Sequence, residues 1–123
     1  MKGDEKLIIA KDLLENNLAY KIKKLSLDFT YKQLHITFFD GIQLYVVYND
    51  HDEYSYSILF SKLELDRCRF DNYDDRWNVS TRPHHFHPRK KKEAIQSIMK
   101  GIPDQDMDKL IEFLKLGKIK ESM

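Results

Sequence analysis

Apolar and polar residues alternate with two different periods along this chain. In residues 1–19 the apolar side chains recur every three or four positions, which predicts an N-terminal helix. In residues 20–70 they alternate with polar side chains, the period of strands that bury one face. Asp40-Gly41 separates two such runs and is typical of a tight hairpin, because glycine tolerates a positive φ. The predicted strands are 25–31, 34–38, 42–48, 54–60 and, as an optional fifth, 63–70.

The chain returns to helical spacing after an aperiodic stretch. Residues 71–88 have no period, and irregular loops of this length in a small domain are often functional. Residues 90–100 and 103–116 each carry an apolar stripe at helical spacing. This order predicts a single α+β domain over residues 1–123. It has an N-terminal helix, a four- to five-stranded antiparallel meander, the loop, and two short C-terminal helices within 89–116 that pack on one face.

The composition is that of a globular protein. Of the 123 residues, 41% are hydrophobic and 33% are charged, which excludes a disordered or low-complexity chain. The single cysteine, Cys68, excludes an internal disulfide and a cysteine-based zinc site. No signal-like N-terminal stretch and no apolar run of about 20 residues is present, so we expect a cytoplasmic protein without membrane contact.

The net charge of +1 conceals an acidic stretch followed by a basic one. Residues 40–75 contain three Lys or Arg against nine Asp or Glu, whereas residues 76–100 contain seven against one. Two interpretations remain open: the basic stretch meets a phosphate backbone, or the two stretches pair with each other. The run Arg89-Lys90-Lys91-Lys92 is most simply a solvated helix start, and it indicates phosphate binding only weakly.

Three of the five histidines lie in one short segment, Pro83-His84-His85-Phe86-His87-Pro88. Proline favours extended backbone in the residue before it, and neighbouring side chains of an extended chain point to opposite sides. We therefore expect His85 and His87 on one face of the segment and His84 on the other.

This segment suits the cleavage of RNA without a metal ion. The reaction needs a base for the 2′-OH proton and an acid for the leaving oxygen, and histidine serves as either near neutral pH. It also needs cations for the charge that builds on the phosphoryl oxygens, and Arg82 and Arg89 stand just outside the prolines. We expect an endoribonuclease that uses no cofactor, with His84, His85 and His87 as its candidate catalytic residues.

A second polar group ends the last predicted strand, in Arg67-Cys68-Arg69-Phe70-Asp71-Asn72. Arg67 and Arg69 share one face of that strand. In the functional interpretation Asp71 orients a histidine and Arg69 contacts phosphate, so both join the catalytic set. In the alternative, the arginines lie on a solvated edge and Asp71-Asn72 is a turn.

Aromatic residues are numerous in the same part of the chain. Most tyrosines of the strand-like runs are expected in the core or at its margin. Tyr73 and Trp77 lie outside the periodic segments, so they are the candidates for stacking on unpaired bases. Together with Arg67, Asn72 and the two loop arginines, they form the expected RNA-binding set.

Two other functions remain open on these residues. His85 and His87 on one face are candidate ligands of a transition metal, with Asp71, Asp74 or Asp75 as the third ligand. Alternatively, the chain is a binding module without catalysis, whose acidic and basic stretches meet a protein or a nucleic acid.

The order of the two motifs resembles a known family. Arg69-Phe70-Asp71-Asn72, followed after a loop by Pro83-His84-His85-Phe86-His87, is similar to the motifs of the TumE-like toxins of type II toxin–antitoxin modules. The resemblance covers residues 22–115 and leaves the first helix as an extension. It implies a growth-inhibiting protein that a helix-turn-helix antitoxin neutralises, with a ribonuclease-like activity. The positions that it implies are Arg69, Asp71, Asn72, His84, His85 and His87.

One position departs from the family pattern. Many members place a histidine pair soon after Asp-Asn, whereas this chain has Tyr73-Asp74-Asp75-Arg76. If that pair is catalytic in the family, this chain uses another acid or base, or it is inactive.

Overall fold

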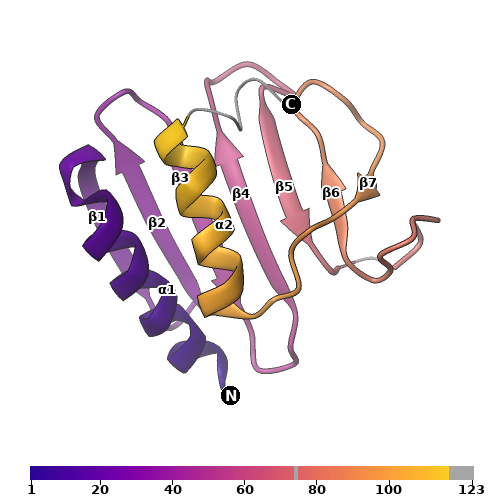
Figure 1. Ribbon diagram of the computed structural model, residues 1–123, viewed down its shortest axis with the longest axis horizontal. Helices are drawn as coiled ribbons and strands as arrows, with labels where there is room; N and C mark the ends of the chain where they lie inside the picture. The colour runs from indigo at the N-terminus through magenta and orange to yellow at the C-terminus, as the bar shows by residue number, and fades with distance from the viewer. Residues whose placement is uncertain (74, 117–123) are drawn as a thin grey trace.

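A computed structural model describes residues 1–73 and 75–116, which form an antiparallel sheet with two helices on one face (Figure 1). Helix α1 (Gly3–Leu18) passes through a 3-10 turn, η1 (Ala19–Lys21), into strand β1 (Ile22–Asp28). The remaining elements, in chain order, are β2 (Gln33–Phe38), β3 (Gln43–Tyr48), β4 (Tyr54–Leu59), β5 (Arg67–Asp71), β6 (His85–His87), β7 (Ile95–Gln96) and α2 (Pro103–Leu116).

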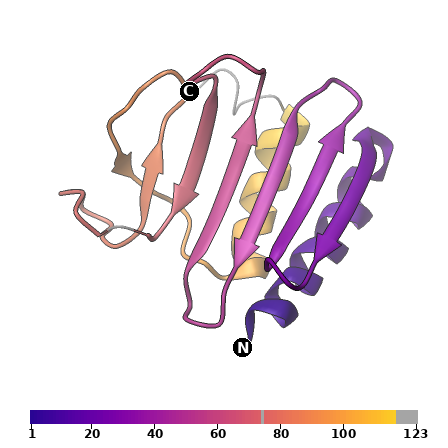
Figure 2. The ribbon, with the colours of Figure 1, turned by 180° about the vertical axis from the view of Figure 1, so that it is seen from behind.

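The strands lie in the sheet in the order in which they occur in the chain, so the sheet is a meander. Each strand pairs antiparallel with the next. This confirms the predicted α+β class with an N-terminal helix and an antiparallel meander. Figure 2 shows the opposite face of the sheet, which neither helix covers. We call it the open face.

The alternation of the sequence places the core between the sheet and the helices. In β2 and β3 every second side chain is buried, and these residues contact the buried stripe of α1. The core extends through β4 to Phe70 in β5 and Phe86 in β6, whose rings stack with centroids 4.3 Å apart. Because β5 and β6 bury these phenylalanines, their flanking residues must point to the open face.

A buried polar chain fixes the second helix against the sheet. The hydroxyls of Tyr48 and Tyr56 are 2.7 Å apart, and Tyr56 donates to Asp106 Oδ2 at 2.6 Å. The Asp106 carboxylate also accepts from the backbone N–H groups of Lys100 and Gly101. Each buried polar group thus has a partner, which spares the cost of leaving it unpaired. As expected, Tyr48, Tyr54 and Tyr56 are core residues.

The strand count exceeds the four to five that the sequence predicted, because β6 and β7 extend the sheet. The predicted helix over 90–100 is wrong: this segment contains only the two-residue strand β7, so a single C-terminal helix packs on the sheet. Its apolar stripe does not form a core face, since Ile95 and Ile98 are exposed while Met99 is buried. The aperiodic stretch 71–88 is not all loop, since it contains the end of β5 and all of β6.

Two predicted strand boundaries also shift. The strand predicted over 25–31 runs from Ile22 to Asp28, and Phe29 and Tyr31 are exposed in the turn that follows. The optional strand over 63–70 begins only at Arg67, because Leu65 has a positive φ of 66° that breaks the extended chain. No helix of the described residues is long and apolar enough to cross a membrane.

Candidate functional site

Strands β5 and β6 bring the two sequence motifs side by side. In their antiparallel register Arg69 lies opposite His87, and Asp71 lies opposite His85. Between these pairs, Phe70 lies opposite Phe86 and points into the core. The four polar side chains therefore emerge together on the open face, and we call Arg69, Asp71, His85 and His87 the His/Asp/Arg cluster.

The Asp71 carboxylate lies at the centre of this cluster, although only 1% of its side chain is exposed. Its Oδ2 forms an ion pair with Arg69 Nε at 2.7 Å, and its Oδ1 lies against His85 Nε2. His87 Nε2 is 3.8 Å from the same Oδ1. A buried carboxylate is tolerated only where cations or donors surround it, and this site supplies them.

His85 is as buried as the carboxylate, and its ring is held at both nitrogens. Nδ1 is 3.0 Å from the carbonyl oxygen of Pro83, and Nε2 faces Asp71. Both partners are oxygen acceptors, so a ring that is protonated at both nitrogens donates to each of them. With a side chain that is only 2% exposed, His85 has little surface to offer a ligand.

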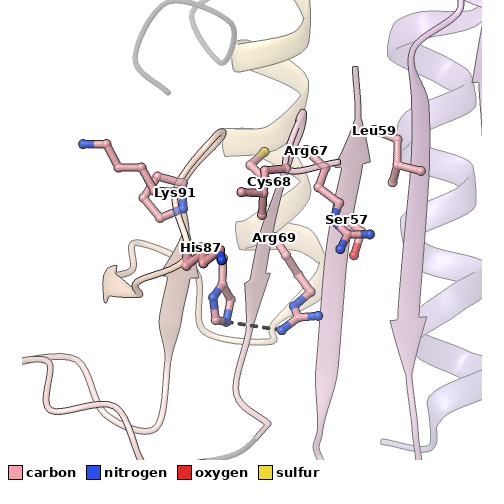
Figure 3. Close-up of a pocket in the computed structure, with 10 residues that line it drawn as sticks. Ser57, Leu59, Arg67, Cys68, Arg69, His87 and Lys91 are labelled. Atoms are coloured by element: carbon pink, nitrogen blue, oxygen red, sulfur yellow. Dashed lines mark hydrogen bonds between the residues drawn. The ribbon is translucent and has the colours of Figure 1, made fainter. Parts of the chain in front are cut away.

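His87 and Arg69 are the accessible members of the cluster. The side chain of His87 is 17% exposed and that of Arg69 is 49% exposed. Arg69 Nη2 lies 3.3 Å from His87 Nε2, as the dashed line in Figure 3 marks. Because a guanidinium only donates hydrogen bonds, Nε2 is the acceptor and the His87 ring carries its proton on Nδ1. The cluster therefore presents a basic nitrogen beside a permanent cation.

Trp77 completes the aromatic surroundings of the cluster. Its ring meets the His87 ring edge to face, with centroids 5.5 Å apart, and lies 6.3 Å from the His85 ring. The Arg76 guanidinium lies over Trp77 at 4.9 Å. Tyr73 is half-buried nearby, and its pKa is raised by this burial and by the charge of Glu53.

Four of the expected site residues lie elsewhere or are engaged in structural contacts. His84 points to the helix side, where Tyr54 Oη is 2.9 Å from its Nδ1 and burial lowers its pKa. Arg82 donates to Asp75, and Arg89 pairs with Asp66 beneath the ring of Phe60. The Asn72 amide ties the start of β4 to the preceding turn, accepting from Tyr54 N and donating to Asp52 O.

These contacts also resolve the two interpretations of the charge pattern. Asp66 and Asp75 of the acidic stretch pair with Arg89 and Arg82 of the basic stretch, so the two stretches do pair in part. The pairing is incomplete, because Lys91 and Lys92 form no ion pair with any residue that the structure describes.

A groove of about 410 Å³ adjoins the cluster on the open face. Sequence analysis missed it, although the run Arg89 to Lys92 gave a weak signal. The cations along it are Arg67, Arg69, Lys91 and Lys92, with His87 at the edge shared with the cluster. Its remaining lining residues are Ser57, Leu59, Leu65, Cys68 and Pro88. Burial raises the pKa of the Cys68 thiol to about 12, so it stays protonated near neutral pH, and no nucleophilic role is indicated.

The same cluster offers the donor set of a metal site. Asp71, His85 and His87 each supply one ligand atom, and these atoms lie within 4.8 Å of one another. Of the three aspartates considered from sequence, Asp71 is the one that the fold brings to the histidines. Asp75 is paired with Arg82, and Asp74 lies outside the described residues.

Comparison with known proteins identifies a family over nearly the whole chain. A family model described as toxin TumE matches residues 4–117, whereas no curated protein and no solved structure matches. The match includes helix α1, which the resemblance over 22–115 had left as an extension, so that expectation is wrong. Membership in a toxin family also implies an antitoxin partner. The chain belongs to the TumE toxin family.

Proposed function

We propose that this toxin cleaves RNA at the His/Asp/Arg cluster without a metal ion. The observation that carries this function is the pairing of an accessible basic nitrogen, His87 Nε2, with the exposed guanidinium of Arg69 at 3.3 Å. These two groups match the two requirements of the reaction, a base for the 2′-OH and a cation for the phosphoryl oxygens.

The reaction is an internal transfer of the phosphoryl group. His87 Nε2 takes the proton of the 2′-OH, whose oxygen then forms a bond to phosphorus. The bond from phosphorus to the 5′-oxygen breaks, and the protonated His87 returns the proton to that oxygen. The products are a 2′,3′-cyclic phosphate and a 5′-OH. Arg69 holds the non-bridging oxygens and stabilises the charge that they gain in the transition state.

Asp71 and His85 are positioning residues in this mechanism, because their burial keeps them from the substrate. Asp71 fixes Arg69 through Nε, which leaves the two terminal nitrogens of the guanidinium for phosphate. His85 packs edge to face on His87, with ring centroids 4.9 Å apart, and thereby limits the rotation of the catalytic ring. The two histidines thus divide the work differently from an acid–base pair.

Trp77 and Tyr73 are the residues that we propose to contact bases. Trp77 borders His87 directly, so a base stacked on its ring would place the adjoining phosphodiester near Arg69. The cognate antitoxin is proposed to be a helix-turn-helix protein, as the family resemblance implies, and we propose a cytoplasmic location for the pair.

The test is cleavage of a single-stranded RNA by the purified protein in the presence of EDTA. We expect His87→Ala to lower the rate by roughly 10²–10⁴-fold and Arg69→Ala by roughly 10²–10³-fold. His51→Ala, which removes an exposed turn histidine, is the matched control and should leave the rate unchanged. No cleavage by the wild type, or equal cleavage by the His87→Ala variant, would refute the proposed activity. RNA binding without turnover would favour the non-catalytic binding module.

A metal-dependent protein is the second candidate, because Asp71, His85 and His87 form a compact donor set. The hydrogen bond of His85 Nδ1 to a backbone carbonyl is the support that metal-bound histidines commonly have. Elemental analysis separates the two functions. A stoichiometric transition metal that is lost in His87→Ala, together with EDTA-sensitive cleavage, would establish the metal site in place of the metal-free mechanism.

A further inference from the structure

The groove beside the cluster shares Arg69 and His87 with it and continues along β5 to Arg67 (Figure 3). We propose that this groove is a second RNA subsite, which binds the phosphate and nucleoside next to the cleaved bond. This role rests on the proposed function, because the groove extends the same site. Its occupant is a segment of single-stranded RNA.

The charges of the groove favour a polyanion. Arg67, Arg69, Lys91 and Lys92 line it, and no carboxylate is among its lining residues. Arg67, Lys91 and Lys92 form no ion pair with any residue in 1–73 or 75–116. The arginines at 82 and 89, by contrast, are engaged by Asp75 and Asp66. Cations that the fold leaves unpaired in one concave surface attract phosphate strongly.

The spacing of the cations follows an extended backbone. Arg67 and Arg69 are two residues apart on one strand, so their Cα atoms are separated by roughly 6.8 Å along β5. This is comparable to the separation of successive phosphates in an extended single strand. Trp77 borders the opposite end of the cluster from the groove. An RNA strand that stacks on Trp77 and crosses Arg69 therefore continues over Arg67.

The size and floor of the groove fit one nucleoside. Its volume of about 410 Å³ is at the lower end of small-molecule sites, too small for a folded protein segment of any length. Leu59, Leu65 and Pro88 supply an apolar floor, and the Ser57 side chain supplies a hydroxyl. An apolar floor with cations at the rim suits a ribose and base whose phosphate faces outward.

The test compares two double variants that remove the same charge from different places. Lys91→Ala/Lys92→Ala empties the rim of the groove, whereas Lys23→Ala/Lys24→Ala removes two exposed lysines of β1 at the far edge of the sheet. Fluorescence anisotropy with a 2′-O-methyl RNA oligonucleotide, which lacks the attacking hydroxyl, measures binding without cleavage. The salt dependence of the affinity is measured for both variants.

Each phosphate contact of a single strand contributes about 0.7 to the slope of log K against log salt, so losing two contacts lowers the slope by roughly 1.4. We expect this change, and weaker binding, for Lys91→Ala/Lys92→Ala alone. Equal effects of the two variants, or no effect of either, would overturn the groove as a subsite. Tighter competition by a poly-glutamate peptide than by the RNA would also overturn it and would assign the groove to an acidic protein segment.

The outcome of this experiment is independent of catalysis. If the wild type cleaves RNA but Lys91→Ala/Lys92→Ala binds and cleaves as well as the β1 variant, the proposed function stands and the subsite is refuted. If binding depends on the groove lysines but no variant cleaves, the subsite stands and the catalytic mechanism is refuted.

Discussion

Asp71→Asn is the substitution that tests the centre of the candidate site. Asparagine has nearly the same shape, so the packing around it is retained while the negative charge is lost. Two contacts change: the ion pair of Oδ2 with Arg69 Nε at 2.7 Å, and the contact of Oδ1 with His85 Nε2. One of these partners is half-exposed and the other is buried, so the two losses differ in size.

The magnitude follows from that difference. Water can solvate the Arg69 guanidinium, which is 49% exposed, so this pair contributes only the roughly 0.2–1 kcal/mol of a surface ion pair. The His85 nitrogen has no access to water, and a buried donor without its acceptor costs roughly 1–3 kcal/mol. We therefore expect a loss of about 2 kcal/mol in the free energy of unfolding. For a chain of 123 residues this lowers Tm by roughly 8 °C.

The assay is urea denaturation followed by circular dichroism, with RNA cleavage measured on the same samples at a temperature where both proteins are folded. Asp75→Asn is the matched control, because it removes the same charge from an ion pair whose members are both half-exposed. We expect a change below about 1 kcal/mol for the control. If the two variants lose equal stability, or if Asp71→Asn cleaves as fast as the wild type, Asp71 does not organise the cluster.

Two further predictions concern elements that hold the site in place. Gly3→Ala should destabilise the fold by roughly 1–3 kcal/mol in thermal denaturation, because the added Cβ meets the Tyr48 carbonyl oxygen, whereas Asn16→Ala on the exposed helix surface should not. Burial lowers the pKa of His84, so the unfolded chain takes up its proton first and stability falls as the pH drops below 6.5. In His84→Asn this part of the pH dependence of Tm should disappear; an unchanged profile would contradict it.

The sequence alone predicted the elements whose burial is regular. In β2 and β3 the alternation is complete, because one face meets α1 and the other is open, so the pattern is visible in any window. It also placed His85 and His87 on one face of an extended segment and His84 on the other, and both placements are confirmed by the contacts of these rings.

The sequence failed where an element is defined by its partner rather than by its own pattern. Residues 90–100 have helical apolar spacing, but the free edge of β6 offers backbone donors and acceptors, and Ile95–Gln96 pairs with it as β7. β6 itself has only three residues and carries polar side chains on its outer face, so its period was hidden inside the aperiodic stretch.

What the sequence determined by itself is the chemistry that the chain contains: a carboxylate, histidines and arginines in two short motifs, with the side of the strand on which each lies. What only the tertiary structure decided is which of them meet. Asp71 faces His85 across the sheet rather than along the chain, and Arg82 and Arg89 are engaged by aspartates while Lys91 and Lys92 are left along a groove. Cross-strand partners are set by register, and register depends on the burial of Phe70 and Phe86 against the whole core, which no local pattern encodes.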